Sequence, residues 1–99
     1  MPIKVRGYLT YKELIGEQSI NLPDGQTMTI SGLLTSLANR LGLEFSESIY
    51  DPQTEMLGEH VAVIINGRRY RNLPDKLDTQ LEDEDEVAIF PPMAGGSYS

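Results

Sequence analysis

The stretch TISGLLTSLANRLG, residues 29–42, decides the fold because it carries the one long helical pattern of the chain. Its apolar residues recur at intervals of three and four, which places them on one stripe of a helix: Ile30, Leu33, Leu34, Leu37, Ala38 and Leu41. The Thr29 hydroxyl can cap the amino end, and Gly42 can adopt the positive φ that often ends a helix. The stripe predicts one main helix packed against an apolar surface.

Two strands are predicted before this helix. Residues 3–11 alternate between polar side chains and inward-facing Ile3, Val5, Gly7, Leu9 and Tyr11, the period of two of a half-buried strand. Residues 12–18 are interpreted as a turn into a second strand at residues 19–22, with Ile20 and Leu22 facing inward. Pro23-Asp24-Gly25 has the composition of a turn.

The chain after the helix is expected to supply the remaining strands. Residues 43–60 are interpreted as a long connection, with a short helical turn, whose apolar side chains meet the edge of the core: Leu43, Phe45, Ile49, Met56 and Leu57. Residues 61–65 form a continuous β-branched run, typical of a central strand. Asn66-Gly67 predicts a hairpin, which continues into a fourth strand at residues 68–71.

The last part of the domain is predicted to be a short turn, an acidic turn and a final strand. Leu77 and Leu81 are expected beneath the sheet, and residues 82–86 form the acidic turn. Residues 87–90 follow as a strand, with Phe90 opposite the core face. The element order predicts an α+β fold of the β-grasp type: a mixed sheet of about five strands on one main helix, with first and last strands adjacent.

Composition limits the possible functions. A chain of 99 residues is one domain by length, and the absence of cysteine removes disulfides, thiolate metal sites and thiol nucleophiles. The formal net charge of −7 argues against nucleic acid as the main partner. No apolar run approaches the ~20 residues that span a membrane, so a cytoplasmic location is expected.

Three charged features have ordinary structural interpretations. The run 82–86 is expected to be a solvated turn and docking surface, because like-charge blocks are usually exposed. His60, the single histidine, lacks a metal-binding pattern and is interpreted as a surface residue. Arg68, Arg69 and Arg71, around Tyr70, either protect a strand edge or contact an acidic partner. An enzyme acting alone is not expected.

The segment Pro91-Pro92-Met93-Ala94-Gly95-Gly96 is unlike the rest of the chain. Two prolines favour an extended polyproline-like course, and two glycines can enter a channel too narrow for side chains. A frayed terminus is the ordinary alternative. We therefore expect a β-grasp domain at residues 1–90, a projecting tail at 91–96 and an extension at 97–99.

This ending, from Asp85 to Gly96, together with the strand and turn at residues 61–67, resembles the ubiquitin-like sulfur carriers of the MoaD/ThiS superfamily. The resemblance is strongest to the small subunit of molybdopterin synthase. It implies that the Gly96 carboxylate is adenylated with ATP by an adenylyltransferase related to ubiquitin activators (MoeB/ThiF type). A sulfurtransferase then supplies sulfur to form a thiocarboxylate, which the molybdopterin synthase large subunit uses. The carrier itself binds no cofactor or metal.

The resemblance also implies roles for the tail residues. Gly96 is the acyl-adenylate and thiocarboxylate carrier, Gly95 is the narrow residue before it, and the docking segment is Phe90, Pro91, Pro92, Met93 and Ala94. The extension Ser97-Tyr98-Ser99 departs from the family pattern, because a peptide bond to Ser97 blocks adenylation. A peptidase that cleaves between Gly96 and Ser97 is therefore expected. The alternatives are a ubiquitin-like protein modifier, a sulfur donor for thiamine, cysteine or tRNA thiolation, and a binding module that is never activated.

Overall fold

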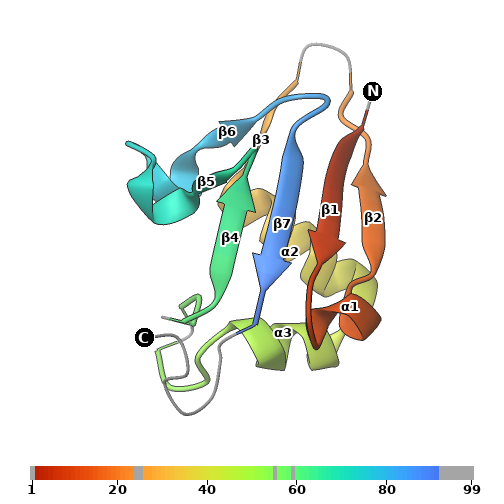
Figure 1. Cartoon of the computed structure of the whole chain (residues 1–99), viewed down its shortest axis with the longest axis vertical. Helices are drawn as coiled ribbons and strands as arrows, with labels where there is room; N and C mark the ends of the chain where they lie inside the picture. Colours follow the sequence, from red (N-terminus) through yellow and green to blue (C-terminus); the bar gives the residue numbers. More distant parts are fainter. Residues whose placement is uncertain (1, 24–25, 55, 59, 92–99) are drawn as a thin grey trace.

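The protein is a five-stranded mixed sheet packed on one main helix, as a computed structural model shows for residues 2–23, 26–54, 56–58 and 60–91 (Figure 1). The strand order is β2-β1-β7-β4-β5. The strands span Ile3–Gly7 (β1), Glu17–Ile20 (β2), Ala62–Ile65 (β4), Arg68–Arg69 (β5) and Glu86–Phe90 (β7). β1 and β7 lie side by side and parallel, and the other neighbours are antiparallel. The predicted α+β, ubiquitin-like β-grasp is confirmed.

The main helix, α2 (Ile30–Leu41), has the bounds that its apolar stripe predicted. The Thr29 Oγ1 accepts a hydrogen bond from the Gly32 backbone N–H at 2.9 Å, and Gly42 ends the helix with a φ of 88°. Four stripe residues are fully buried against the sheet: Ile30, Leu33, Leu34 and Leu37. They meet the inward-facing residues of the three inner strands, which are Ile3, Val5, Val63, Ile65, Val87 and Ile89.

The first strand is shorter than predicted, because it ends at Gly7 and leads into a short helix, α1 (Tyr11–Leu14). Tyr11 is buried as part of α1 and not as part of the strand. Leu9, which was predicted to face inward, is 53% exposed. A Cβ on Gly7 would lie 2.3 Å from the Tyr11 carbonyl oxygen, so only glycine lets α1 fold back this closely. The prediction of a turn at residues 12–18 is therefore wrong, because residues 11–14 form α1 and β2 begins at Glu17.

The connection after α2 contains a second helix, α3 (Leu43–Ile49), longer than the short turn predicted there. Phe45 and Ile49 lie four residues apart on one face of α3 and are buried, as predicted. Leu43 and Met56, also predicted to meet the core, are 76% and 67% exposed. Leu43, the first residue of α3, lies off the stripe that Phe45 and Ile49 turn toward the core, and Met56 lies in the connection after the helix.

β4 is an interior strand between β7 and β5, as the β-branched run predicted. The strands after α3 correct two other predictions. β5 has only two residues, and Tyr70 is buried in the 3-10 turn η1 (Tyr70–Asn72) that follows it. Residues near Leu81 form β6 (Gln80–Leu81) after the turn η2 (Lys76–Asp78), and β6 pairs with β3 (Met28–Thr29) in a separate small sheet.

Candidate functional site

The candidate site begins where β7 ends. Phe90 is half-buried on the side of β7 opposite the core, as predicted, and Pro91 is buried. The Tyr8 backbone N–H donates to the Ile89 carbonyl oxygen at 3.0 Å. The rings of Tyr8 and Phe90 stack with centroids 4.6 Å apart and an interplanar angle of 11°. The end of β1 therefore fixes the chain direction at Pro91, while the predicted site residues Pro92, Met93, Ala94, Gly95, Gly96 and Ser97 lie outside the described residues.

Tyr8 is the functional candidate that the sequence predictions missed. The sequence could have placed Tyr8 on the outward face of the sheet, because Lys4, Arg6 and Tyr8 alternate with the buried residues of β1. Phe90 lies on the same face of β7. What alternation cannot show is the register that places one ring on the other. Phe90 alternates with the buried Val87 and Ile89, so the stacked pair lies on the face of the sheet opposite α2, which covers the other face (Figure 1).

The face opposite α2, here called the open face, is organised in rows across the strands. The row beside the tail contains Tyr8, Phe90 and Ala62, since Ala62 is the register partner of Phe90. In the next row Ala88 pairs with both Arg6 and Ile64, and Ile64 pairs with Arg69. Five half-buried residues thus form an apolar strip that reaches the root of the tail: Tyr8, Ala62, Ile64, Ala88 and Phe90.

Charged side chains border the apolar strip. Arg6 Nη2 contacts Glu17 Oε1 at 2.6 Å. The Glu17 carboxylate, together with the Tyr8 phenol, raises the pKa of Arg6, and Arg6 lowers the pKa of Glu17. Both groups are largely exposed, so solvent screens the pair and its contribution to the stability of the fold is small.

The acidic turn before β7 is only partly a solvated surface. Glu82, Asp83 and Glu84 are exposed, as predicted. Asp85 instead orders the turn, because its carboxylate accepts hydrogen bonds from the Asn66 side chain at 3.0 Å and the Glu82 backbone N–H at 2.8 Å. Asn66 Oδ1 in turn accepts from the Glu86 backbone N–H at 2.9 Å. The predicted hairpin turn and the start of β7 are therefore tied together.

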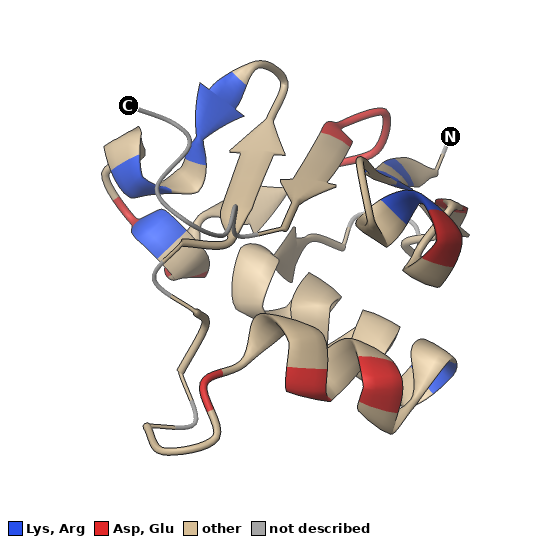
Figure 2. Cartoon of the chain, turned by 60° about the horizontal axis from the view of Figure 1, so that its bottom comes forward, with Lys and Arg blue, Asp and Glu red and all other residues tan. Residues whose placement is uncertain are grey.

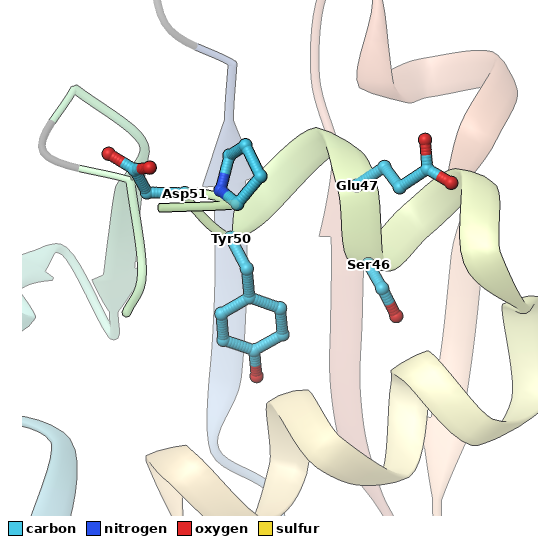
Figure 3. A pocket seen from close by; sticks show the side chains of 5 residues that line it. Ser46, Glu47, Tyr50 and Asp51 are labelled. Atoms are coloured by element: carbon cyan, nitrogen blue, oxygen red, sulfur yellow. The ribbon is translucent and has the colours of Figure 1, made fainter. Parts of the chain in front are cut away.

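A hollow of about 540 Å³ lies at the end of α3 and is lined by Ser46, Glu47, Tyr50, Asp51 and Pro52 (Figure 3). The Tyr50 ring points toward α2, and burial raises the pKa of its phenol. The Ser46 hydroxyl donates to the Gly42 carbonyl oxygen at 3.5 Å, and Asp51 Oδ1 accepts from the Gln53 backbone N–H. The Ser46 and Asp51 groups thus make hydrogen bonds within their own segment, and among the described residues that line the hollow no hydrogen bond pairs a nucleophile with a base.

The described ranges contain no group of three acidic, histidine or cysteine side chains able to hold a metal ion. His60 is exposed, in agreement with its interpretation as a surface residue. The site therefore consists of a fixed strand end, an apolar strip beside it and a charged border. Such a surface can bind another protein and present the chain that follows Pro91 to it.

Comparison with known proteins identifies the kind of molecule that has this arrangement. The model of the ThiS family matches residues 8–96, which include Tyr8, β7 and the tail. The chain belongs to the ThiS family. This ThiS-family chain is 33% identical to small archaeal modifier protein 3 of Haloferax volcanii over 96 residues, which cover 97% of this chain and 100% of the relative.

Solved structures agree with this membership. The small archaeal modifier protein 1 of Methanosarcina acetivorans is 26% identical with a TM-score of 0.75, over 96% of each chain. A candidate molybdopterin converting factor, subunit 1, from Pyrococcus furiosus shares the fold, with a TM-score of 0.66 and 24% identity over 94% of this chain and 99% of that one. The resemblance to the MoaD/ThiS superfamily is confirmed, and the chain is a ubiquitin-like protein of the carrier and modifier class. In the described residues, no helix has the length and apolar character needed to cross a membrane.

Proposed function

We propose that this chain is a sulfur carrier whose Gly96 bears a thiocarboxylate and supplies sulfur for molybdopterin or tungstopterin synthesis. The observation that carries the proposal is the anchored root of the tail: Phe90 stacks on Tyr8, and the ThiS-family match continues through residue 96. A fixed exit from the sheet reduces the conformational freedom that is lost when the tail enters a partner. Under this proposal, the chain is a co-substrate or small subunit of partner enzymes.

The proposed chemistry takes place on the Gly96 carboxylate. A partner adenylyltransferase joins it to AMP from ATP and releases pyrophosphate, which converts a poor electrophile into a good one. The terminal sulfur of a persulfide on a sulfurtransferase attacks the carbonyl carbon, and AMP leaves. A thiol of the donor then attacks the resulting acyl disulfide, so that a disulfide forms on the donor and the Gly96 thiocarboxylate is released.

Activation requires a free carboxylate on Gly96, so we propose that a peptidase first removes Ser97-Tyr98-Ser99. Incubation of the full chain in lysate of the host, followed by intact-mass measurement, is expected to show loss of these three residues. A chain that keeps its full mass while a chain ending at Gly96 is activated in the same lysate would contradict this step.

The molybdopterin role has its own test. The carrier ending at Gly96, loaded with sulfur, is mixed with the molybdopterin synthase large subunit and its pterin precursor. Formation of the dithiolene product, with return of Gly96 to a carboxylate, is the expected result. A carrier that loads fully but delivers no sulfur in this reaction would limit the proposal to sulfur carriage for another acceptor, such as a thiamine, cysteine or tRNA thiolation pathway.

A second candidate function is a protein modifier joined through Gly96 to lysines of other proteins. The 33% identity to small archaeal modifier protein 3 favours this candidate. Peptides from cells that express a tagged chain would then carry a Gly-Gly remnant on lysine, and these would disappear with a Gly96→Ala variant. Loading with sulfur without any such remnants would favour the carrier alone.

A further inference from the structure

The turn between β4 and β5 places a reactive amide beside a residue that does not hinder its reaction. Asn66 and Gly67 form a two-residue loop, since Ile65 and Arg68 are register partners. Their φ angles of 50° and 88° both lie in the left-handed region, as a type I′ turn requires. The chain has four asparagines, and Asn66 is the one followed by glycine. Glycine has no side chain to shield its backbone nitrogen, and the space around Gly67 is open.

The reaction open to this pair is loss of ammonia from the Asn66 side chain. The Gly67 backbone nitrogen attacks the Asn66 Cγ, so that a new C–N bond forms and the bond between Cγ and Nδ2 breaks. The proton of the attacking nitrogen leaves with the ammonia. Water then opens the resulting five-membered succinimide at either carbonyl, which gives aspartate or isoaspartate. Both residues are exposed, so water reaches them without any opening of the core.

Three hydrogen bonds hold Asn66 against the start of β7. Its backbone N–H donates to the Glu86 carbonyl oxygen at 2.8 Å, and its Oδ1 accepts from the Glu86 backbone N–H at 2.9 Å. Its Nδ2 donates to Asp85 Oδ1 at 3.0 Å. For attack by Gly67, the side chain must turn back toward its own backbone, so both side-chain hydrogen bonds must break first. These two bonds therefore slow the reaction in the folded protein.

Conversion of the amide would break the tie between the two turns. An aspartate at position 66 has no N–H to donate to Asp85 and instead brings a second carboxylate to hydrogen-bond distance of the first. Figure 2 shows residues 82–86 as a continuous red segment, so the new charge joins five acidic residues and is repelled by them. Isoaspartate lengthens the backbone of the two-residue loop, on which the register of β4 and β5 depends.

We propose that Asn66 is a deamidation site of this chain, protected in the folded state by its hydrogen bonds to Asp85 and Glu86. The proposal does not depend on the sulfur-carrier function, because Asn66 contacts the start of β7 and the tail follows the other end of this strand (Figure 1). Conversion separates the β4–β5 turn from the acidic turn and so lowers the stability of the sheet.

The test is incubation of the full chain in mildly alkaline buffer, followed by trypsin digestion and mass spectrometry. Trypsin cuts after Arg40 and Arg68 and releases residues 41–68, in which Asn66 is the one asparagine. Conversion adds the mass difference between an amide and a carboxylic acid, and chromatography separates the aspartate and isoaspartate products. The folded chain is expected to convert at least about 10-fold more slowly than the same chain in urea, where the two side-chain hydrogen bonds are absent.

Two variants separate the local hydrogen bonds from overall stability. Asp85→Ala removes the acceptor of the Nδ2 hydrogen bond, so Asn66 is expected to convert about 5-fold faster than in the unchanged folded chain. Gly7→Ala is the matched control, because its Cβ would lie 2.3 Å from a backbone oxygen and destabilise the fold at the other end of β1. It is expected to leave the conversion rate unchanged, since local opening of the turn controls the reaction.

A third variant, Asn66→Asp, reproduces one product and is expected to lower the thermal unfolding midpoint by about 4–8 °C. An unchanged midpoint would overturn the claimed effect on the sheet. Absence of conversion in urea, or aspartate without isoaspartate, would overturn the deamidation route. Equal rates in the folded chain and in urea, or an unchanged rate in Asp85→Ala, would overturn the protection. Equal acceleration in Asp85→Ala and Gly7→Ala would show that overall stability controls the rate and would also overturn it.

Discussion

The stack between Tyr8 and Phe90 makes a quantitative prediction about the root of the tail. With centroids 4.6 Å apart and rings 11° from parallel, the pair has the contact geometry of interacting aromatic rings. Such pairs contribute about 0.5–1.5 kcal/mol beyond the area they bury. A double-mutant cycle of Tyr8→Ala and Phe90→Ala is therefore expected to give a coupling free energy of about 1 kcal/mol.

The assay is urea or thermal unfolding of the unchanged chain, the two single variants and the double variant. About 1 kcal/mol corresponds to a shift of roughly 4–8 °C in the unfolding midpoint for a domain of this size. Tyr8→Phe keeps the ring and is expected to keep the coupling. Ile64→Ala serves as the control, because Ile64 lies two strands from Tyr8 and changes at that distance are expected to add. A Tyr8–Phe90 coupling below about 0.3 kcal/mol would refute the view that the stack holds the root of the tail.

Three further predictions concern the frame that holds the site. Gly7→Ala is expected to cost about 1–3 kcal/mol of unfolding free energy, because its Cβ would lie 2.3 Å from the Tyr11 carbonyl oxygen; an unchanged denaturant midpoint would contradict this. Asp85→Ala is expected to cost about 1–3 kcal/mol, because it removes the acceptor for two hydrogen bonds, and Asp85→Asn should recover part of the loss; equal losses in both variants would argue against the hydrogen bonds. Burial raises the pKa of the Tyr11 phenol, so the contribution of the neutral phenol to the unfolding free energy is fully present below about pH 10 and is lost as the pH rises through the folded-state pKa. Tyr11→Phe removes the hydrogen bond that this phenol donates to the Ser48 carbonyl oxygen. The difference in unfolding free energy between the unchanged chain and Tyr11→Phe should therefore shrink above about pH 10.

The β-grasp was predictable because its main signals are strong and local. The apolar stripe of α2 is flanked by a hydroxyl residue, Thr29, and a glycine, Gly42. In the structure Thr29 caps the amino end of the helix and Gly42 ends it, so both bounds were predictable. The alternation of β7 predicted that Phe90 would lie opposite the core, and it does. Each of these patterns depends on residues close in sequence.

The errors came from places where distant contacts decide the structure. Tyr11 continues the alternation of β1, but it is buried from α1, because Gly7 allows that helix to pack onto the strand end. β3 and β6 are only two residues each and have no pattern of their own, so their pairing depends on tertiary packing. The Tyr8–Phe90 stack needed the parallel register of β1 and β7, which no local pattern contains.

The charged residues likewise include some whose placement follows from local sequence and some whose placement depends on distant contacts. The exposure of residues 82–84 follows from like charge alone, whereas Asp85 acts through hydrogen bonds to Asn66 and Glu82. Arg69 was predicted as part of a charged edge, and its place in a row with Ile64 and Ala88 became visible only with the strand register.

The central claim is that Gly96 carries sulfur, and the intact mass of the carrier tests it most directly. A chain ending at Gly96 is incubated with the activating enzyme, ATP and a persulfide donor, with the chain ending at Ser99 as the matched control. The account predicts a gain of about 16 Da, from the exchange of one oxygen for sulfur, in the shorter chain and no change in the longer one. An unchanged mass of the shorter chain, under conditions in which the enzyme activates another carrier, would contradict the account.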